Sequence, residues 1–150
     1  MSLRGERAKE LFKEGYNCAQ AVLIAFSDVT GFDKKTSAMI ASGFGGGMGR
    51  MREVCGAVSG MFIAYNIMNG YFDPSDNDGK MQNYADVQKL AADFREENGS
   101  IICKELLGLS KPEGTHIPEK RTDEYYKKRP CGDIVKSAAE ILEEFINNRS

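Results

Sequence analysis

The apolar run VCGAVSGMFIAYNIMN, at positions Val54–Asn69, decides the fold of this 150-residue chain. Apolar residues recur along it mostly at three- and four-residue steps, which is the spacing of a helix face. Gly56, Gly60 and Ala64 fall every four residues, so one side of the predicted helix carries almost no side-chain bulk. We expect that side to lie directly against a neighbouring helix or a bulky inorganic group, and the sequence leaves both alternatives open.

The rest of the chain shows the same helical spacing and no convincing strand alternation, which predicts an all-α fold. Asn17 and Asp33 are typical helix caps, and Gly15 and Gly99 are typical helix stops. We therefore expect a single domain over residues 1–150, a helical bundle of about six to seven helices. Besides residues 54–69, the predicted helices span about residues 4–14, 18–28, 34–42, 80–97 and 131–147, with a short helix that carries Cys103, Leu106 and Leu107 and ends at Gly108.

Three segments between these helices are predicted to be irregular. The first, Gly43–Gly49, is a glycine-rich connection. The second, Asp73–Gly79, is polar and reads as a turn, because Pro74 would occupy the first ligand position of a calcium loop. The third, Lys111–Arg129, has two prolines and the only histidine, His116, and is predicted to be an exposed loop with at most a short helical piece.

Composition excludes several functional classes. Lys and Arg number 20 against 22 Asp and Glu, a formal net charge of −2, and the basic-aromatic cluster Tyr125–Arg129 reads as a solvated face. We therefore expect no nucleic-acid partner. Ser59, Asn66 and Asn69 interrupt the apolar run, so no membrane span is predicted. Charged residues near the N-terminus stand where a signal peptide would be apolar, which favours a cytoplasmic location, where disulfides are disfavoured.

Each of the four cysteines stands where a helix is predicted to begin. Cys18 follows the predicted cap Asn17, and Cys103 stands three residues after the predicted cap Ser100. Cys55 opens the central run, and Cys131 follows a proline. A helix N-terminus carries roughly half a positive charge and unsatisfied N–H groups, so a thiol there is predicted to ionise, and a thiolate is both a nucleophile and a metal ligand. The alternative is that the cysteines are small apolar core residues.

The segment before Cys55 is predicted to form a positively charged cradle. Arg50 and Arg52 supply the charge, and the glycines let another group approach the main chain. We assign cofactor binding to Arg50 together with six glycines: Gly45, Gly46, Gly47, Gly49, Gly56 and Gly60. A nucleotide is not expected, because the segment has neither the dinucleotide fingerprint nor a Gly-Lys-Ser/Thr loop, and a helix precedes it.

Five sequence features together carry a family resemblance. The central feature is Cys55–Gly60, which reads CGAVSG, and it is accompanied by Asn17–Gln20, Phe44–Gly49, Cys103 and Cys131. In this order and combination they resemble the C_GCAxxG_C_C family of redox-active proteins. The resemblance is specific, because four dispersed cysteines and an intact Cys-Gly-Ala-x-x-Gly are not expected to coincide by chance.

The resemblance covers about residues 8–146 and implies a small, mainly bacterial or archaeal protein associated with oxidoreductases or transporters. Some relatives resemble split-Soret cytochromes, which carry haem and an iron–sulfur centre. This chain has no Cys-x-x-Cys-His, so haem is not expected.

The leading hypothesis is that Cys18, Cys55, Cys103 and Cys131 converge at one end of the domain as catalytic residues and metal ligands of one redox centre. A [2Fe–2S] or [4Fe–4S] cluster is the predicted cofactor, because four thiolates are its usual ligands. The protein would then exchange electrons with a redox partner protein or oxidoreductase, as an electron carrier or redox subunit. Two alternatives stay open: pairs of the cysteines cycling between thiol and disulfide, and a structural zinc or interaction module, with a homo-oligomer compatible with each.

Overall fold

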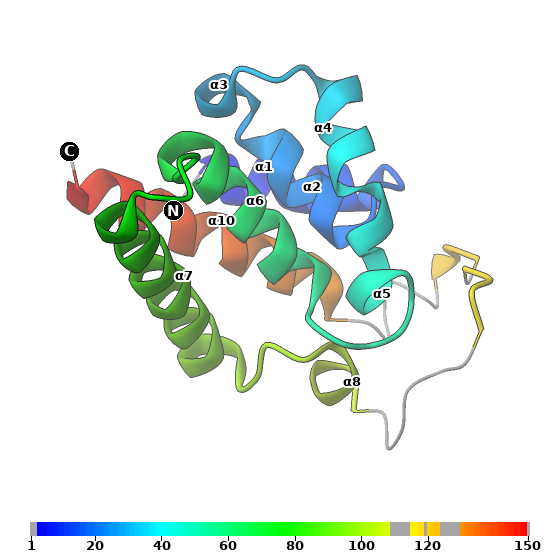
Figure 1. Cartoon of the computed structure of the whole chain (residues 1–150). Helices are drawn as coiled ribbons and strands as arrows, with labels where there is room; N and C mark the ends of the chain where they lie inside the picture. Colours follow the sequence, from blue (N-terminus) through cyan, green and yellow to red (C-terminus); the bar gives the residue numbers. More distant parts are fainter. Residues whose placement is uncertain (1–2, 109–114, 119, 124–129, 150) are drawn as a thin grey trace.

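The computed structural model describes residues 3–108, 115–118, 120–123 and 130–149, and within them the chain is all-α (Figure 1). The β pairing in these residues is one isolated antiparallel bridge, between Val54 and Ile102. Every helix predicted from the sequence has a counterpart. The helices are α1 (Leu3–Lys13), α2 (Cys18–Ala25), α3 (Ser27–Thr30), α4 (Lys34–Ala41), a 3-10 turn (Ser42–Phe44), α5 (Gly45–Met48), α6 (Gly56–Asn69), α7 (Asn77–Asn98), α8 (Cys103–Leu106) and α10 (Cys131–Arg149).

Helix α6 lies in the middle of the bundle, with α2, α7 and α10 packed around it (Figure 1). Its first half is buried on every side, including the fully buried Val58 and Met61. Helix α1 packs along α10 and also contacts α2. At Gly60 the neighbour of α6 is a helix, the first of the two alternatives: a Cβ atom built there would lie 2.6 Å from the carbonyl oxygen of Ala19 in α2.

Side-chain caps set the starts of two helices as the sequence predicts. The Asn17 side chain accepts a 2.9 Å hydrogen bond from the main-chain N–H of Gln20, whose own side chain accepts one of 3.0 Å from the Asn17 N–H. These two bonds form a capping box and fix the start of α2. Asp33 caps α4 by accepting a 2.7 Å bond from the N–H of Thr36.

Three predicted helix boundaries are wrong, each for a local reason. The helix expected over residues 18–28 ends at Ala25, because Phe26 leaves helical geometry, with φ −105° and ψ 16°, before α3 begins. Helix α7 begins at Asn77 and not near residue 80, because Asp76 caps it by accepting a 2.9 Å bond from the Gly79 N–H. Helix α6 begins at Gly56, because Val54 is held in the bridge to Ile102.

The glycine-rich connection contains a left-handed turn instead of a simple irregular loop. Five consecutive residues have positive φ: Gly46, Gly47, Met48, Gly49 and Arg50, at 60–74°. Arg52 follows at φ 60°. Main-chain bonds close the turn, from the Arg52 N–H to Gly46 at 3.3 Å and from the Glu53 N–H to Gly47 at 2.9 Å. Positive φ costs free energy in arginine and methionine, so the surrounding structure must hold these residues in place.

The predicted loop over Lys111–Arg129 is described only in part. Residues 115–118, 120, 122 and 123 are exposed, and Arg121 is half-buried. The remainder of that prediction, including the cluster Tyr125–Arg129, lies outside the described residues. Within the described part of the chain, no helix is long and apolar enough to cross a membrane.

We expect Gly60→Ala to lower the free energy of unfolding by about 1–3 kcal/mol, the usual cost of overpacking a core. The added methyl group would meet the main chain of Ala19, which cannot rotate away. Gly132→Ala, near the start of α10, is the matched control. Its Cβ would lie 3.7 Å from carbons of Lys9, an ordinary contact, so we expect no loss and a gain of at most about 1 kcal/mol. Urea unfolding of both variants measures the difference, and an equal gain in both would contradict the close approach.

Candidate functional site

All four cysteines line one cavity of about 50 Å³, although they come from distant parts of the chain. Cys18 begins α2, Cys103 begins α8 and Cys131 begins α10, while Cys55 is the residue just before α6. The helix starts therefore meet at one end of the bundle, near α5 in Figure 1. None of the four cysteines forms a disulfide. The structure thus brings together the four cysteines that the sequence predicted to converge.

A short antiparallel pairing brings Cys55 and Cys103 together. The Cys55 N–H donates to the carbonyl of Ile101 at 2.8 Å, and the Cys103 N–H donates to the carbonyl of Glu53 at 2.6 Å. The bridge between Val54 and Ile102 lies between these two bonds. Ser100, which the sequence suggested as a helix cap, instead shapes this turn by accepting a 3.0 Å bond from the Ile102 N–H.

Small residues allow the cysteine-bearing elements to approach one another. A Cβ atom at Gly47 would lie 2.6 Å from the Cys103 Cβ and 2.8 Å from the Arg52 Cα. At Gly56 it would lie 3.2 Å from the Cys18 Cβ. Any larger residue at either position would clash with the residues of the cavity wall. Glycine at both positions is therefore needed for the cysteines to approach one another.

The remaining predicted glycines lie around the cavity in different ways. Gly46 lines it directly, whereas Gly45 and Gly49 line a neighbouring recess, and Gly60 presses against α2 one turn beyond the site. His116 also lines the neighbouring recess and not the cysteine cavity.

Arg52 is the arginine that reaches the sulfur atoms. It is only 6% exposed, and its Nη1 lies 3.7 Å from the Cys103 Sγ, to which it donates. Arg50 points elsewhere: its Nη1 donates to the carbonyl oxygen of Ile117. Arg50, which the sequence predicted to bind a cofactor, is therefore not among the residues that line the cysteine cavity, whereas Arg52 is.

Arg121 also lines the cavity, and no sequence pattern predicted it. Its guanidinium group donates to the carbonyls of Phe12 at 2.8 Å and Tyr16 at 3.0 Å, and stacks 4.3 Å from the centre of the Phe12 ring. These contacts hold Arg121 against the end of α1 and the turn that follows it. A lone arginine in a polar loop has no periodicity that could have revealed this.

The expectation that helix starts ionise the thiols is wrong for two of them. Burial raises the pKa of Cys55 to about 12, and the N–H groups of Ala57 and Val58, which lower it, do not compensate. The pKa of Cys18 is raised well above its ordinary value, chiefly by a hydrogen bond with the Cys131 thiol, then by burial of the sulfur and by the neighbouring cysteines. The thiols of Cys18 and Cys55 therefore favour the neutral form.

The four thiols are suitable metal ligands, although their side chains are not arranged as a metal site. Four thiols facing one small cavity are the usual ligand set of an iron–sulfur cluster or structural zinc. Among the residues that the structure describes, no group of three or more His, Cys, Asp or Glu side chains has the arrangement of a metal site. Ligation by Cys18, Cys55, Cys103 and Cys131 would require their sulfurs to turn towards a common point.

The fold and the site define a class: an all-α protein in which four helix starts direct cysteines into one buried cavity. The chain belongs to the C_GCAxxG_C_C family, whose model, described as "Putative redox-active protein (C_GCAxxG_C_C)", matches residues 16–145. The match includes all four cysteines and the glycine turn. No curated protein and no solved structure matches the chain.

The raised pKa of Cys55 predicts a stability loss at alkaline pH in the metal-free protein. A thiol with a folded pKa near 12 and an ordinary value of 9 stabilises the fold fully below pH 9. That contribution is lost as pH rises towards 12, at about 1.4 kcal/mol per pH unit.

Tyrosines and lysines titrate in the same range, so the wild type is compared with Cys55→Ala at each pH. Urea unfolding under reducing conditions should show the stability gap between wild type and variant narrowing between pH 9 and 12. A constant gap would contradict the burial of this thiol.

Proposed function

We propose that this chain is a redox protein whose four cysteines bind one iron–sulfur cluster and exchange electrons with a partner protein. The observation that carries the proposal is the convergence of Cys18, Cys55, Cys103 and Cys131 on one cavity. Their separation along the chain makes the shared cavity a property of the fold and not of a local loop. Membership of a family described as redox-active supports the same reading.

Charge supports a metal centre over four bare thiolates. Four negative sulfurs in a buried space would repel one another, and a metal ion removes that repulsion when it displaces the thiol protons. A bound cluster would supply one-electron chemistry, with the four cysteines as its ligands. Cys18 and Cys131 are the first residues of α2 and α10, and the positive end of each helix would stabilise the net negative charge.

The chain's own residues would tune such a centre. Arg52 donates to the Cys103 sulfur, and the N–H groups of Ala57 and Val58 donate to the Cys55 sulfur. Hydrogen bonds and positive charge at ligand sulfurs favour the reduced form and raise the reduction potential. The apolar residues Phe12 and Ile134 line the cavity as well and limit the access of water.

Anaerobic reconstitution with iron and sulfide tests the proposal. We expect the full chain to take up two or four irons per molecule with matching sulfide and to show a reversible visible absorption change on reduction. Each single Cys→Ser variant should lose most of the bound iron while keeping its helical circular dichroism, because the core does not include the cluster. Ser59→Ala, in α6 near the site, is the control and should retain the iron. A colourless chain that binds one zinc tightly and no iron would contradict the proposal.

A second candidate rests on a specific contact, the hydrogen bond between the thiols of Cys18 and Cys131. Adjacent thiols can form a disulfide, in which two thiols lose two protons and two electrons to an oxidant such as a disulfide of another molecule. Treatment of the metal-free chain with oxidised glutathione should then give a Cys18–Cys131 disulfide, identified by mass spectrometry. A chain that forms this bond reversibly and never takes up iron would replace the cluster proposal with thiol–disulfide chemistry.

A further inference from the structure

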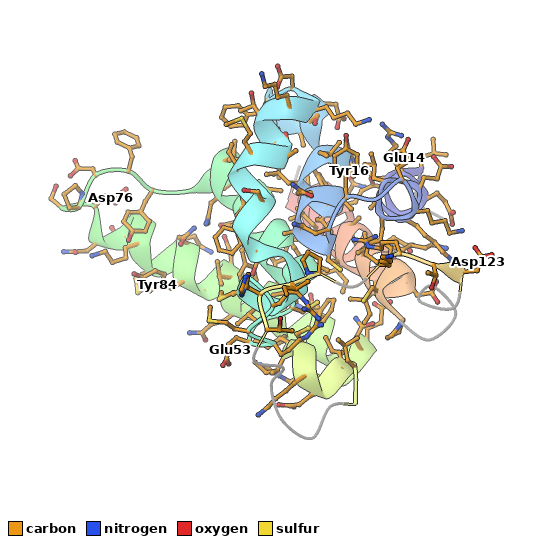
Figure 2. All side chains as sticks on the ribbon, turned by 90° about the vertical axis from the view of Figure 1, so that its right-hand side faces the viewer. Glu14, Tyr16, Glu53, Asp76, Tyr84 and Asp123 are labelled. Carbon is orange, nitrogen blue, oxygen red and sulfur yellow. The ribbon has the colours of Figure 1, made fainter. Side chains whose placement is uncertain are left out.

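Residues 42–45 lead from α4 into the left-handed turn and lie between the starts of α2 and α6. A Cβ atom built at Gly45 would lie 2.5 Å from the Asn17 Nδ2, and one built at Gly56 would lie 3.0 Å from the carbonyl oxygen of Phe44. Figure 2 looks onto this end of the bundle, where α4, in cyan, runs towards α5 with α2, in blue, beside it. The shape of the cysteine cavity therefore depends on where residues 42–45 are held.

Two half-buried amide side chains, Asn17 and Gln20, hold this segment, and each uses both ends of its amide. Their oxygens form the capping box of α2, in which each accepts a hydrogen bond from the main-chain N–H of the other residue. Their amino groups reach α4: the Asn17 Nδ2 donates to the carbonyl of Ser42 at 3.1 Å, and the Gln20 Nε2 donates to the carbonyl of Ala38 at 3.0 Å. We call this pair of side chains the amide clamp.

The amide clamp joins the beginning of one helix to the end of another. The first N–H groups and the last carbonyls of a helix lack partners within it. In a regular helix the Ser42 N–H would donate to the Ala38 carbonyl, but here it donates to the carbonyl of Met39. Gln20 supplies a donor to Ala38 instead. Because the same two side chains bond to the start of α2 and to the end of α4, neither end can shift without breaking bonds to the other.

Capping alone would not require two amides. Serine is as good an N-cap as asparagine, and glutamate at the third helical position completes a capping box as well as glutamine does. Neither serine nor a carboxylate has an N–H group, whereas a side-chain amide accepts and donates at the same time. The amide clamp uses both functions, so its residue types fit the connection to α4 and not only the start of α2.

We propose that the amide clamp positions Cys18 against the glycine turn and so keeps this wall of the cysteine cavity closed. Asn17 lines the cavity beside Cys18, and Gly46 of the turn lines it as well. Asn17 and Gln20 are positioning residues, because they act through the helix start and the turn. The inference goes beyond the proposed function, since the clamp acts on the cavity whatever the cysteines hold.

The rate at which iodoacetamide alkylates Cys18 in the reduced, metal-free full chain tests the clamp, with mass spectrometry reporting each cysteine separately. Asn17→Ser and Gln20→Glu each keep a capping oxygen and lose the donor to α4. We expect each variant to raise the rate about threefold to tenfold, the effect of one lost hydrogen bond on a local opening equilibrium. The negative charge of glutamate disfavours a nearby thiolate, so a faster reaction in Gln20→Glu reports access to the sulfur and not charge.

A pair of glycine variants tests the same contact without changing the clamp residues. In Gly45→Ala the added methyl group would press on the Asn17 side chain, so we expect the same rise in Cys18 alkylation. Gly43→Ala is the matched control two residues earlier, where a Cβ atom would have no neighbour within 4 Å, and it should leave the rate unchanged.

A further control separates positioning from a general loss of stability. Asp33→Ala removes the side-chain cap at the opposite end of α4 and should destabilise that helix without changing the rate at Cys18. Circular dichroism checks the fold, and Gln20→Glu and Gly45→Ala decide the result if Asn17→Ser unfolds. An unchanged rate in the clamp variants, or an equal rise in Asp33→Ala, would overturn the proposal. Because no metal is present in these measurements, their outcome is independent of iron uptake by the cysteines.

Discussion

The close contact between α6 and the main chain of α2 is the constraint on which the rest of the site depends. Gly60 touches the carbonyl of Ala19, and one turn earlier Gly56 lies against the Cβ of Cys18. Because these two glycines have no side chain, the start of α6 can approach the start of α2 closely. Cys55 and Cys18 therefore line the same cavity. The pairing of residues 53–55 with residues 101–103 holds the start of α8 beside the start of α6. This pairing brings Cys103 to the same cavity.

The left-handed turn connects this packing to the electrostatics of the site. It reverses the chain between α4 and α6 and positions Arg52 in the cavity wall, with its guanidinium beside the Cys103 sulfur. The Arg52 guanidinium would interact more favourably with thiolates or with an anionic cluster than with neutral thiols. The strained main chain and the buried charge therefore both make physical sense if the cavity holds negative charge when the protein works.

The sequence sufficed for the helices and for the convergence of the cysteines, because both follow from local rules. Apolar spacing marks each helix, and a cysteine at each helix start must meet the others if the starts gather at one end of the bundle. It did not reveal the orientation of Arg50 and Arg52, which depends on the sign of φ along five residues. It also missed Arg121, whose contacts are long-range, and the pKa of Cys55, since burial is a tertiary property that outweighs the helix start.

The central claim is that four distant cysteines act as one centre. X-ray absorption at the iron edge of the anaerobically reconstituted chain tests it most directly, because it reports the atoms bonded to the metal. We expect every ligand atom bonded to iron to be sulfur in the wild type. A single change to serine should remove most of the iron, and the iron that remains should gain an oxygen or nitrogen ligand; this holds for each of Cys18, Cys55, Cys103 and Cys131. Nitrogen or oxygen ligands in the wild type, or a spectrum unchanged by one of the four substitutions, would contradict a single four-cysteine centre.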